Sequence, residues 1–214
     1  MPIRTMRPAG SVLATGLQEF VDTLPSGLLM AEIGSYAGET LPYFLQKAAQ
    51  IFCIDRWEDY AETVGDTSHR MMIDQMTWVE DIFNRTGIIY GDRVVKVKDD
   101  SLTVAARCPP ETFDLVYIDA GHTYADVRAD IEAWWPKVRP GGRLAGHDYD
   151  RLRGGVQMAV QECCGQPDQL FPDSTWCFLL TPDLAARLRE RGDHGGAESV
   201  GRNSVSDERR LPSV

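Results

Sequence analysis

Two histidines and two carboxylates stand in two short polar stretches, each of which follows an apolar run. Asp119 and His122 belong to the stretch I-D-A-G-H-T-Y, and His147 and Asp148 belong to G-H-D-Y-D. Carboxylate and imidazole groups bind divalent cations, and a hydroxyl bound to such an ion loses its proton more easily. We predict that Asp119, His147 and Asp148 bind one divalent ion. His122 is the candidate general base, because an imidazole with a pKa near about 6.5 can take a proton at neutral pH.

A glycine turn after an earlier apolar run has the residue types of a ligand cradle. The nine residues Glu32 to Thr40 read E-I-G-S-Y-A-G-E-T. Gly34 permits a sharp turn or a close approach to a ligand, and Gly38 removes a side chain where the following helix would crowd the strand. A dinucleotide fingerprint has the spacing G-x-G-x-x-G. This turn has G-x-x-x-G, and the preceding Glu32 suits a cationic amine better than a diphosphate.

The turn resembles motif I, E/D-x-G-x-x-x-G, of class I S-adenosylmethionine-dependent methyltransferases, which implies S-adenosylmethionine as cofactor. Asp55 would then accept both ribose hydroxyls, Asp100 would accept the exocyclic amine of adenine, and Ser101 would cap the following helix. Both acids have the plainer alternative of capping, and Trp57 either packs on the adenine or belongs to the core. The predicted cofactor contacts are Glu32, Gly34, Ser35, Gly38, Asp55, Trp57, Asp100, Ser101 and Asp119.

Short apolar runs recur along the chain with room for helices between them, which is typical of a parallel sheet covered on both faces. The predicted strands are Leu28–Ile33, Gln50–Ile54, Val94–Val97, Phe113–Ile118, Gly142–Ala145 and Trp176–Leu180. The predicted helices are Leu41–Ala49, Leu102–Arg107, Tyr124–Val138 and Gly155–Cys163, the third with Pro140-Gly141-Gly142 as its stop signal. The fold class is therefore α/β, with a doubly wound, mostly parallel, Rossmann-like sheet. Ligands bind beyond the carboxyl ends of such strands, where the polar stretches stand.

The domain organisation follows from the same pattern. Residues 1–27 are predicted to be a helical lead-in, and residues 28–191 a single methyltransferase domain. Within it, residues 57–91 form a long connection with an apolar helix predicted over Ser68–Asn84, which either belongs to the core or caps a substrate cleft. Residues 192–214 are poor in apolar side chains, so we expect a disordered tail.

The stretch I-D-A-G-H-T-Y, an amphipathic helix, R-P-G-G and G-H-D-Y-D together resemble the bacterial methyltransferase 24 family, over about residues 28–180. Relatives that methylate sugar hydroxyls bind magnesium through an Asp after strand four and an acidic pair after strand five. Asp119 and Asp148 match these ligands, and His147 replaces the first acid of the pair. An imidazole ligand favours manganese or zinc over magnesium. His122 occupies the position of the base proposed in some relatives.

Composition excludes several classes of partner. The chain has 214 residues and a formal net charge of -10, which disfavours binding to nucleic acid. Its five cysteines are odd in number and lack C-x-x-C spacing, so we expect a reducing cytoplasm. No apolar stretch approaches the roughly 20 residues of a membrane helix. We therefore expect a cytoplasmic protein without a membrane partner, and a homo-oligomer remains possible.

The leading hypothesis is a metal-assisted O-methyltransferase that acts on a hydroxylated small molecule, such as a sugar or a glycosylated metabolite. Two alternatives stay open at this point. A nicotinamide-dependent oxidoreductase is disfavoured by the missing G-x-G-x-x-G. A non-catalytic S-adenosylmethionine-binding module is suggested only by the replacement at His147.

Overall fold

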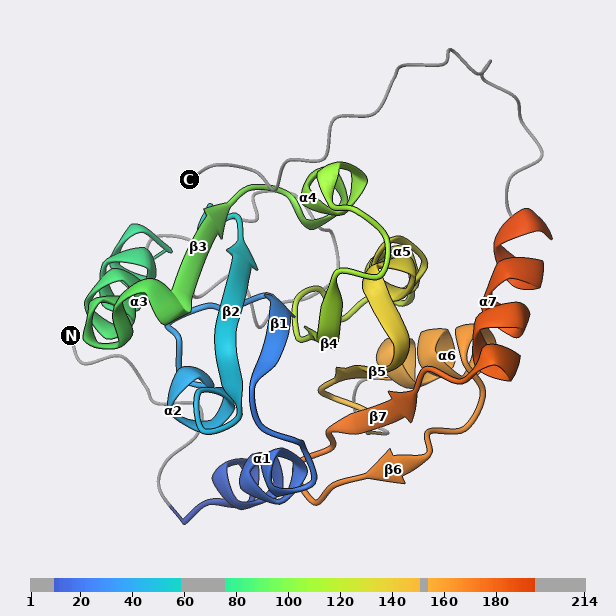
Figure 1. Cartoon of the computed structure of the whole chain (residues 1–214), viewed down its shortest axis with the longest axis horizontal. Helices are drawn as coiled ribbons and strands as arrows, with labels where there is room; N and C mark the ends of the chain where they lie inside the picture. The colour runs from blue at the N-terminus through green and yellow to red at the C-terminus, as the bar shows by residue number, and fades with distance from the viewer. Residues whose placement is uncertain (1–9, 59–75, 151–153, 195–214) are drawn as a thin grey trace.

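A seven-stranded sheet forms the centre of the molecule (Figure 1). The computed structural model describes residues 10–58, 76–150 and 154–194. The strands are β1 (Leu28–Ile33), β2 (Ala48–Asp55), β3 (Val94–Lys98), β4 (Phe113–Ile118), β5 (Val138–Gly146), β6 (Gln169–Leu170) and β7 (Trp176–Leu179). Their order in the sheet is β3-β2-β1-β4-β5-β7-β6. Strands β1 to β5 are parallel, and β7 pairs antiparallel with both β5 and β6, so the predicted doubly wound, mostly parallel sheet is confirmed.

Helices cover both faces of the sheet. The helices are α1 (Val12–Asp22), α2 (Leu41–Phe44), α3 (Met76–Tyr90), α4 (Ser101–Arg107), α5 (Tyr124–Trp134), α6 (Gly154–Cys163) and α7 (Pro182–His194), with 3-10 turns η3 (Gly91–Arg93) and η4 (Trp135–Lys137). Met30 and Tyr117 face a core shared with α1, α2 and α3. Ala31 and Val116 face a second core shared with α4 to α7. Because side chains alternate along a strand, β1, β2, β4, β5 and β7 each contribute to both cores.

The helix predicted over Leu41–Ala49 is wrong in its second half. Helix α2 ends at Phe44, and the next residues close a turn in which the amides of Gln46 and Lys47 donate to carbonyls three positions back. Ala48 already pairs with Leu28 of β1. Pairing with the neighbouring strand therefore prevails over the local helical pattern. A short sequence window does not reveal such pairing.

The end of the helix predicted over Tyr124–Val138 also differs. Helix α5 stops at Trp134, a 3-10 turn containing Pro136 follows, and Val138 pairs with Phe113 of β4. Proline cannot donate the backbone hydrogen bond that a continuing helix needs. The predicted stop signal thus lies inside β5, where Gly141 has a φ of +77°.

The described part of the long connection contributes to both the core and the cavity, since Val79 and Phe83 are buried and Met76 lines the cavity. The predicted helix Ser68–Asn84 lies partly outside the described residues, and its described part is α3, which continues to Tyr90. Val79 and Phe83 of α3 are buried against Trp57 in the first core. Residues 192–194 belong to α7, and the remainder of the predicted tail lies outside the described residues.

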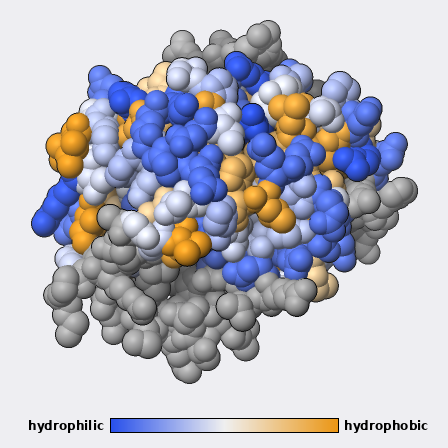
Figure 2. Space-filling view, turned by 90° about the horizontal axis from the view of Figure 1, so that it is seen from below, coloured by the Kyte–Doolittle hydropathy of each residue, from blue (hydrophilic) through white to orange (hydrophobic). Residues whose placement is uncertain are grey.

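Exposed apolar residues are scattered on the surface. The face shown in Figure 2 carries mostly hydrophilic side chains, with hydrophobic ones in small separate groups. Ile88 and Ile89, at the end of α3, are among the most exposed large apolar residues. Within the described ranges, no helix is both long enough and apolar enough to cross a bilayer.

Candidate active site

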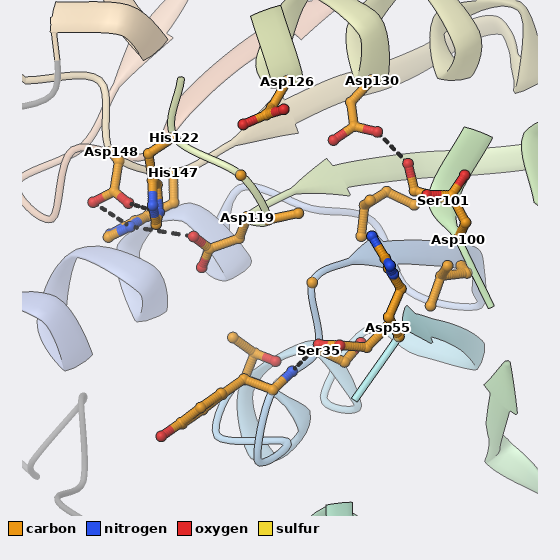
Figure 3. A pocket seen from close by; sticks show the side chains of 18 of the residues that line it. Ser35, Asp55, Asp100, Ser101, Asp119, His122, Asp126, Asp130, His147 and Asp148 are labelled. Carbon is orange, nitrogen blue, oxygen red and sulfur yellow. Dashed lines mark hydrogen bonds and ion pairs between the residues drawn. The ribbon is translucent and has the colours of Figure 1, made fainter. Parts of the chain in front are cut away.

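A cavity of about 530 Å³ lies at the carboxyl ends of the parallel strands. Its walls come from the turn after β1, from the residues that follow β2 to β5, and from one face of α5 (Figure 3). The polar lining residues that the sequence predicted are Gly34, Ser35, Asp55, Asp100, Ser101, Asp119, His122, His147 and Asp148. The sheet thus gathers in one cavity residues that are far apart along the chain, as expected for a doubly wound sheet.

Gly34 lets the turn after β1 touch the end of β4. Its φ is +88°, and a Cβ atom at this position would lie 2.2 Å from the carbonyl oxygen of Asp119 and 2.7 Å from Cα of Ala120. No side chain fits into that space. The glycine is therefore required by contact between two segments of the chain, in addition to the predicted approach to a ligand.

Gly38 leaves room for side chains that pack behind the turn. It has a φ of +74°, and a Cβ atom there would lie 3.0 Å from Leu41 and 3.2 Å from Phe83. Gly38 does not line the cavity. The structure therefore agrees with the predicted crowding by the following helix.

Glu32 and Trp57 do not reach the cavity either. Glu32 is 1% exposed, and its carboxylate accepts a hydrogen bond from the hydroxyl of Thr40. The ring of Trp57 packs on Phe83 with centroids 4.7 Å apart, and its indole nitrogen donates to the carbonyl of Tyr36 at 2.7 Å. The prediction that Trp57 packs on adenine is therefore wrong for this structure, because the ring is already buried and hydrogen bonded in the core.

Asp55 ties the end of β2 to the glycine turn. Its two carboxylate oxygens accept the backbone amides of Tyr36 and Trp57, each at 2.8 Å. Burial raises the pKa of Asp55, and these hydrogen bonds partly offset that rise. The carboxylate lines the cavity between the turn and β3, at the place predicted for a ribose.

Asp100, and not Ser101 as predicted, caps α4. Asp100 is the N-cap of α4, and its Oδ1 accepts the amides of Leu102 and Thr103, each at 3.1 Å. Ser101 instead donates its hydroxyl to Asp130 of α5. Aspartate is as good an N-cap as serine, so the sequence alone could not choose between them.

Asp130 is a cavity residue that the sequence analysis missed. It lies on the buried face of α5 together with Val127, Ile131 and Trp134. Burial raises its pKa to about 6. The available signal was an acidic residue at helical spacing within an apolar stripe, where a carboxylate is costly unless it has a partner.

Asp119, His122 and Asp148 form the group best placed for a metal ion. Each offers one ligand atom, and the three atoms lie within 4.8 Å of one another. Nε2 of His122 lies 2.7 Å from Oδ2 of Asp148. Nδ1 of His147 lies 3.1 Å from Oδ1 of Asp148 and 3.7 Å from Oδ1 of Asp119 (Figure 3). The predicted third ligand was His147. In the structure His122 takes that place, and His147 lies beside the group.

The backbone around Asp148 turns its carboxylate into this group. Asp148 has a φ of +62°, a conformation that aspartate tolerates better than most residues. The amide of Tyr149 donates to the carbonyl of Ser174 at 3.0 Å, and the indole of Trp176 donates to the carbonyl of His147 at 3.2 Å. Burial alone would raise the pKa of Asp148, but the hydrogen bonds and charges of both histidines outweigh it and lower the pKa.

A buried polar network supports His147 from the opposite side. Nε2 of His147 lies 3.8 Å from Oδ2 of Asp173, a residue that the sequence analysis missed. Asp173 accepts hydrogen bonds from the amide and the hydroxyl of Thr175, which also bonds the hydroxyl of Tyr117. Asp173 stands in a loop without a readable pattern, so only the contact of this loop with Tyr117 of β4 and with His147 reveals its position.

Sequence comparison assigns most of the cavity's lining to one family. The profile of a family described as a methyltransferase domain, the methyltransferase 24 family, matches residues 31–149, more than half of the chain. The chain belongs to the methyltransferase 24 family. The matched region is thus a class I, S-adenosylmethionine-dependent methyltransferase domain, and the match runs from the glycine turn to the residues that follow β5.

Individual relatives of this methyltransferase are distant. An uncharacterized protein of Sinorhizobium fredii, y4gI, is 27% identical over 131 residues, which cover 56% of this chain and 13% of that protein. The structure of CalS11, a calicheamicin methyltransferase, has a TM-score of 0.54 at 18% identity and covers 78% of this chain and 76% of its own. The O-methyltransferase NovP has a TM-score of 0.53 at 17% identity and 78% coverage of both chains. At these identities the likeness shows a shared fold.

Proposed function

We propose that this methyltransferase transfers the methyl group of S-adenosylmethionine to a hydroxyl of a small molecule, such as a sugar or a glycosylated metabolite, with the help of a divalent cation. The proposal rests chiefly on the position of Asp119, His122 and Asp148, which line the same cavity as the Gly34 turn. Had these side chains pointed away from the cavity, a non-catalytic binding module would have been favoured.

Methyl transfer to a hydroxyl requires alignment and removal of one proton. The S–CH₃ bond breaks, an O–CH₃ bond forms, and S-adenosylhomocysteine leaves. Gly34, Ser35 and Asp55 would hold the cofactor along one wall of the cavity, so that positioning supplies much of the rate. Without a bound cation, the hydroxyl proton would pass to His122, since a carboxylate 2.7 Å from the ring stabilises its protonated form. With a cation held by Asp119, His122 and Asp148, the bound hydroxyl would instead lose its proton to solvent.

The residues also suit a divalent cation. Asp119, His122 and Asp148 offer two carboxylate oxygens and one imidazole nitrogen, a donor set that favours manganese or zinc over magnesium. Such an ion, when bound, would lower the pKa of the acceptor hydroxyl. Two proteins of the same fold have names consistent with the proposal, the O-methyltransferase NovP and the calicheamicin methyltransferase CalS11.

Calorimetric titration with S-adenosylmethionine tests the cofactor site. We expect the wild type to bind and Gly34→Trp to lose binding, since no side chain fits beside Asp119. Gly27→Trp is the matched control, because Gly27 also has a positive φ but nothing lies within 4 Å of its Cβ position. Equal affinity of wild type and Gly34→Trp would remove the turn from the proposed site.

A product assay tests the reaction. The wild type is incubated with S-adenosylmethionine, a panel of hydroxylated glycosides and Mn²⁺, Mg²⁺ or a chelator, and methylated products are sought by mass spectrometry. We expect an O-methylated product whose formation falls with the chelator. With the acceptor identified, His122→Ala should lower turnover by about 10²- to 10⁴-fold. Full turnover in that variant would contradict the role of His122.

A further inference from the structure

When S-adenosylmethionine binds as proposed above, the two ends of the cavity hold different parts of the cofactor. The role assigned to Asp130 rests on that proposed function. The sulfonium methyl group must lie near Asp119, His122 and Asp148, where the acceptor is proposed to bind. The ribose would lie beside Asp55. The adenine then falls at the opposite end, which is lined by Ser101 and Asp130 (Figure 3).

Three of the carboxylates at this end are engaged in local structure. Oδ1 of Asp99 accepts the amide of Asp100, and its other oxygen pairs with Arg107. Oδ1 of Asp100 accepts amides of the first turn of α4. Asp126 accepts the hydroxyl of Thr123 at 2.7 Å. These three side chains are less buried than the fourth carboxylate, so water competes with a ligand for them.

Asp130 is the fourth carboxylate, and it is only 6% exposed. Its Oδ1 accepts the hydroxyl of Ser101. Across the ranges that the structure describes, no group donates to its Oδ2 at hydrogen-bond distance. Asp130 lines the cavity, so a ligand N–H placed at Oδ2 would form a charge-assisted hydrogen bond with a carboxylate that is largely shielded from water. Burial raises the pKa of Asp130 to about 6, so at neutral pH the group is mainly ionised and acts as an acceptor.

We propose that Asp130, and not Asp100, accepts the exocyclic amino group of adenine and makes the site select adenine over a 6-oxopurine. The amino group donates hydrogen bonds, whereas the corresponding oxygen of hypoxanthine is an acceptor and would face the carboxylate unfavourably. A site built around a buried acceptor discriminates strongly against a ligand that lacks the matching donor. Asp130 therefore acts as a specificity residue for the cofactor.

Binding of two cofactor products tests the assignment. The affinities of S-adenosylhomocysteine and S-inosylhomocysteine are measured by calorimetry at pH 7.5 for the wild type, Asp130→Asn and Asp100→Asn. Asparagine keeps the size of each side chain, and at position 100 it remains a good N-cap. We expect the wild type to prefer the adenosyl compound by about 10-fold or more. Asp130→Asn should reduce this preference to within about 3-fold of unity, and Asp100→Asn should keep it.

Three results would overturn the assignment: a wild-type preference near unity, an unchanged preference in Asp130→Asn, or a lost preference in Asp100→Asn. Thermal melts of all variants establish that they are folded. If Asp130→Asn is unstable, Asp130→Ala replaces it in the comparison, and we expect this variant to lose the preference as well. Failure of the wild type to bind S-adenosylhomocysteine at all would instead contradict the cofactor, so the two failures are distinguishable.

Discussion

His122 and His147 differ in what their ring nitrogens face. His122 points one nitrogen at Asp148 within the group of three ligand atoms, whereas His147 lies between Asp148 and the buried Asp173. In the proposed metal site, the first arrangement is that of a direct ligand. The second is that of a residue that orients a ligand, a role whose loss typically costs about 10- to 100-fold in metal affinity.

Titration with Mn²⁺, followed by electron paramagnetic resonance or calorimetry, tests this difference. His122→Ala should weaken Mn²⁺ binding more than His147→Ala, because it removes a ligand atom, while the loss in His147→Ala stays within about 10- to 100-fold. The larger loss in His147→Ala would restore the ligand set expected from the sequence. Thr103→Ala, remote from the group, is the control for nonspecific loss.

Asp130 gives the stability of the protein a specific pH dependence. Its pKa is raised from 3.8 to about 6 by burial, so between these values the folded protein holds a proton that the unfolded chain has lost. The free energy of unfolding therefore falls as pH rises through this window, by up to about 3 kcal/mol. Asp130→Asn removes this contribution.

Urea denaturation at pH 4 and pH 7 measures the effect. The quantity compared is the free energy of unfolding of Asp130→Asn minus that of the wild type. We expect this difference to be about 1–3 kcal/mol larger at pH 7 than at pH 4. Ser101 can still donate to the asparagine oxygen, so the local packing is kept. A difference between the two proteins that does not change with pH would show that Asp130 has an ordinary pKa.

At the scale of elements, the contact between the turn after β1 and the end of β4 assembles the site. It brings Ser35 and Tyr36 beside Asp119, and it depends on the missing side chain of Gly34. Gly34→Ala should therefore destabilise the protein by more than the cost of a strained φ, which is about 1–3 kcal/mol. Gly27→Ala has nearly the same φ and open space around its Cβ, so it should show the φ cost alone.

Urea denaturation of the two glycine variants separates strain from collision. We expect Gly34→Ala to lose at least about 2 kcal/mol more than Gly27→Ala, since its Cβ would lie 2.2 Å from a backbone oxygen. Equal losses would mean that the end of β4 moves aside easily. The contact would then not fix the geometry of the cavity.

The hydroxyl of Tyr117 links β4 to the loop before β7. It lies 2.9 Å from the hydroxyl of Thr175, which donates to Asp173 behind His147. Tyr117→Phe should cost about 1 kcal/mol in the free energy of unfolding, because it removes one buried hydrogen bond. Thermal denaturation measures this loss, and an unchanged stability would show that the network contributes nothing to holding β4 to the loop before β7.

At the scale of the whole molecule, the cofactor should stabilise the folded chain. Binding of S-adenosylhomocysteine at 100 times its dissociation constant adds about 2.7 kcal/mol to the free energy of unfolding. For a chain of this size that corresponds to a rise in melting temperature of about 5–10 °C. Differential scanning fluorimetry checks the expectation with Gly34→Trp as the control, and no shift in the wild type would contradict binding.

Much of the fold was predictable, because strands buried on both faces have a sequence signature. The strands Leu28–Ile33 and Phe113–Ile118 coincide with β1 and β4. The boundaries that failed, at the ends of α2 and α5, depend on pairing with strands elsewhere in the chain. A local pattern carries no information about such partners.

The sequence by itself determined the fold class and the place of the site, since apolar runs predict the strands and polar residues at their carboxyl ends predict where ligands bind. Only the tertiary structure decided which side chains meet. Trp57 turned into the core, His122 joined Asp119 and Asp148, and Asp130 reached Ser101 from another helix. The direction of a side chain depends on the packing of segments that are distant in sequence, as at Gly34, where β1 and β4 leave no room for a Cβ atom.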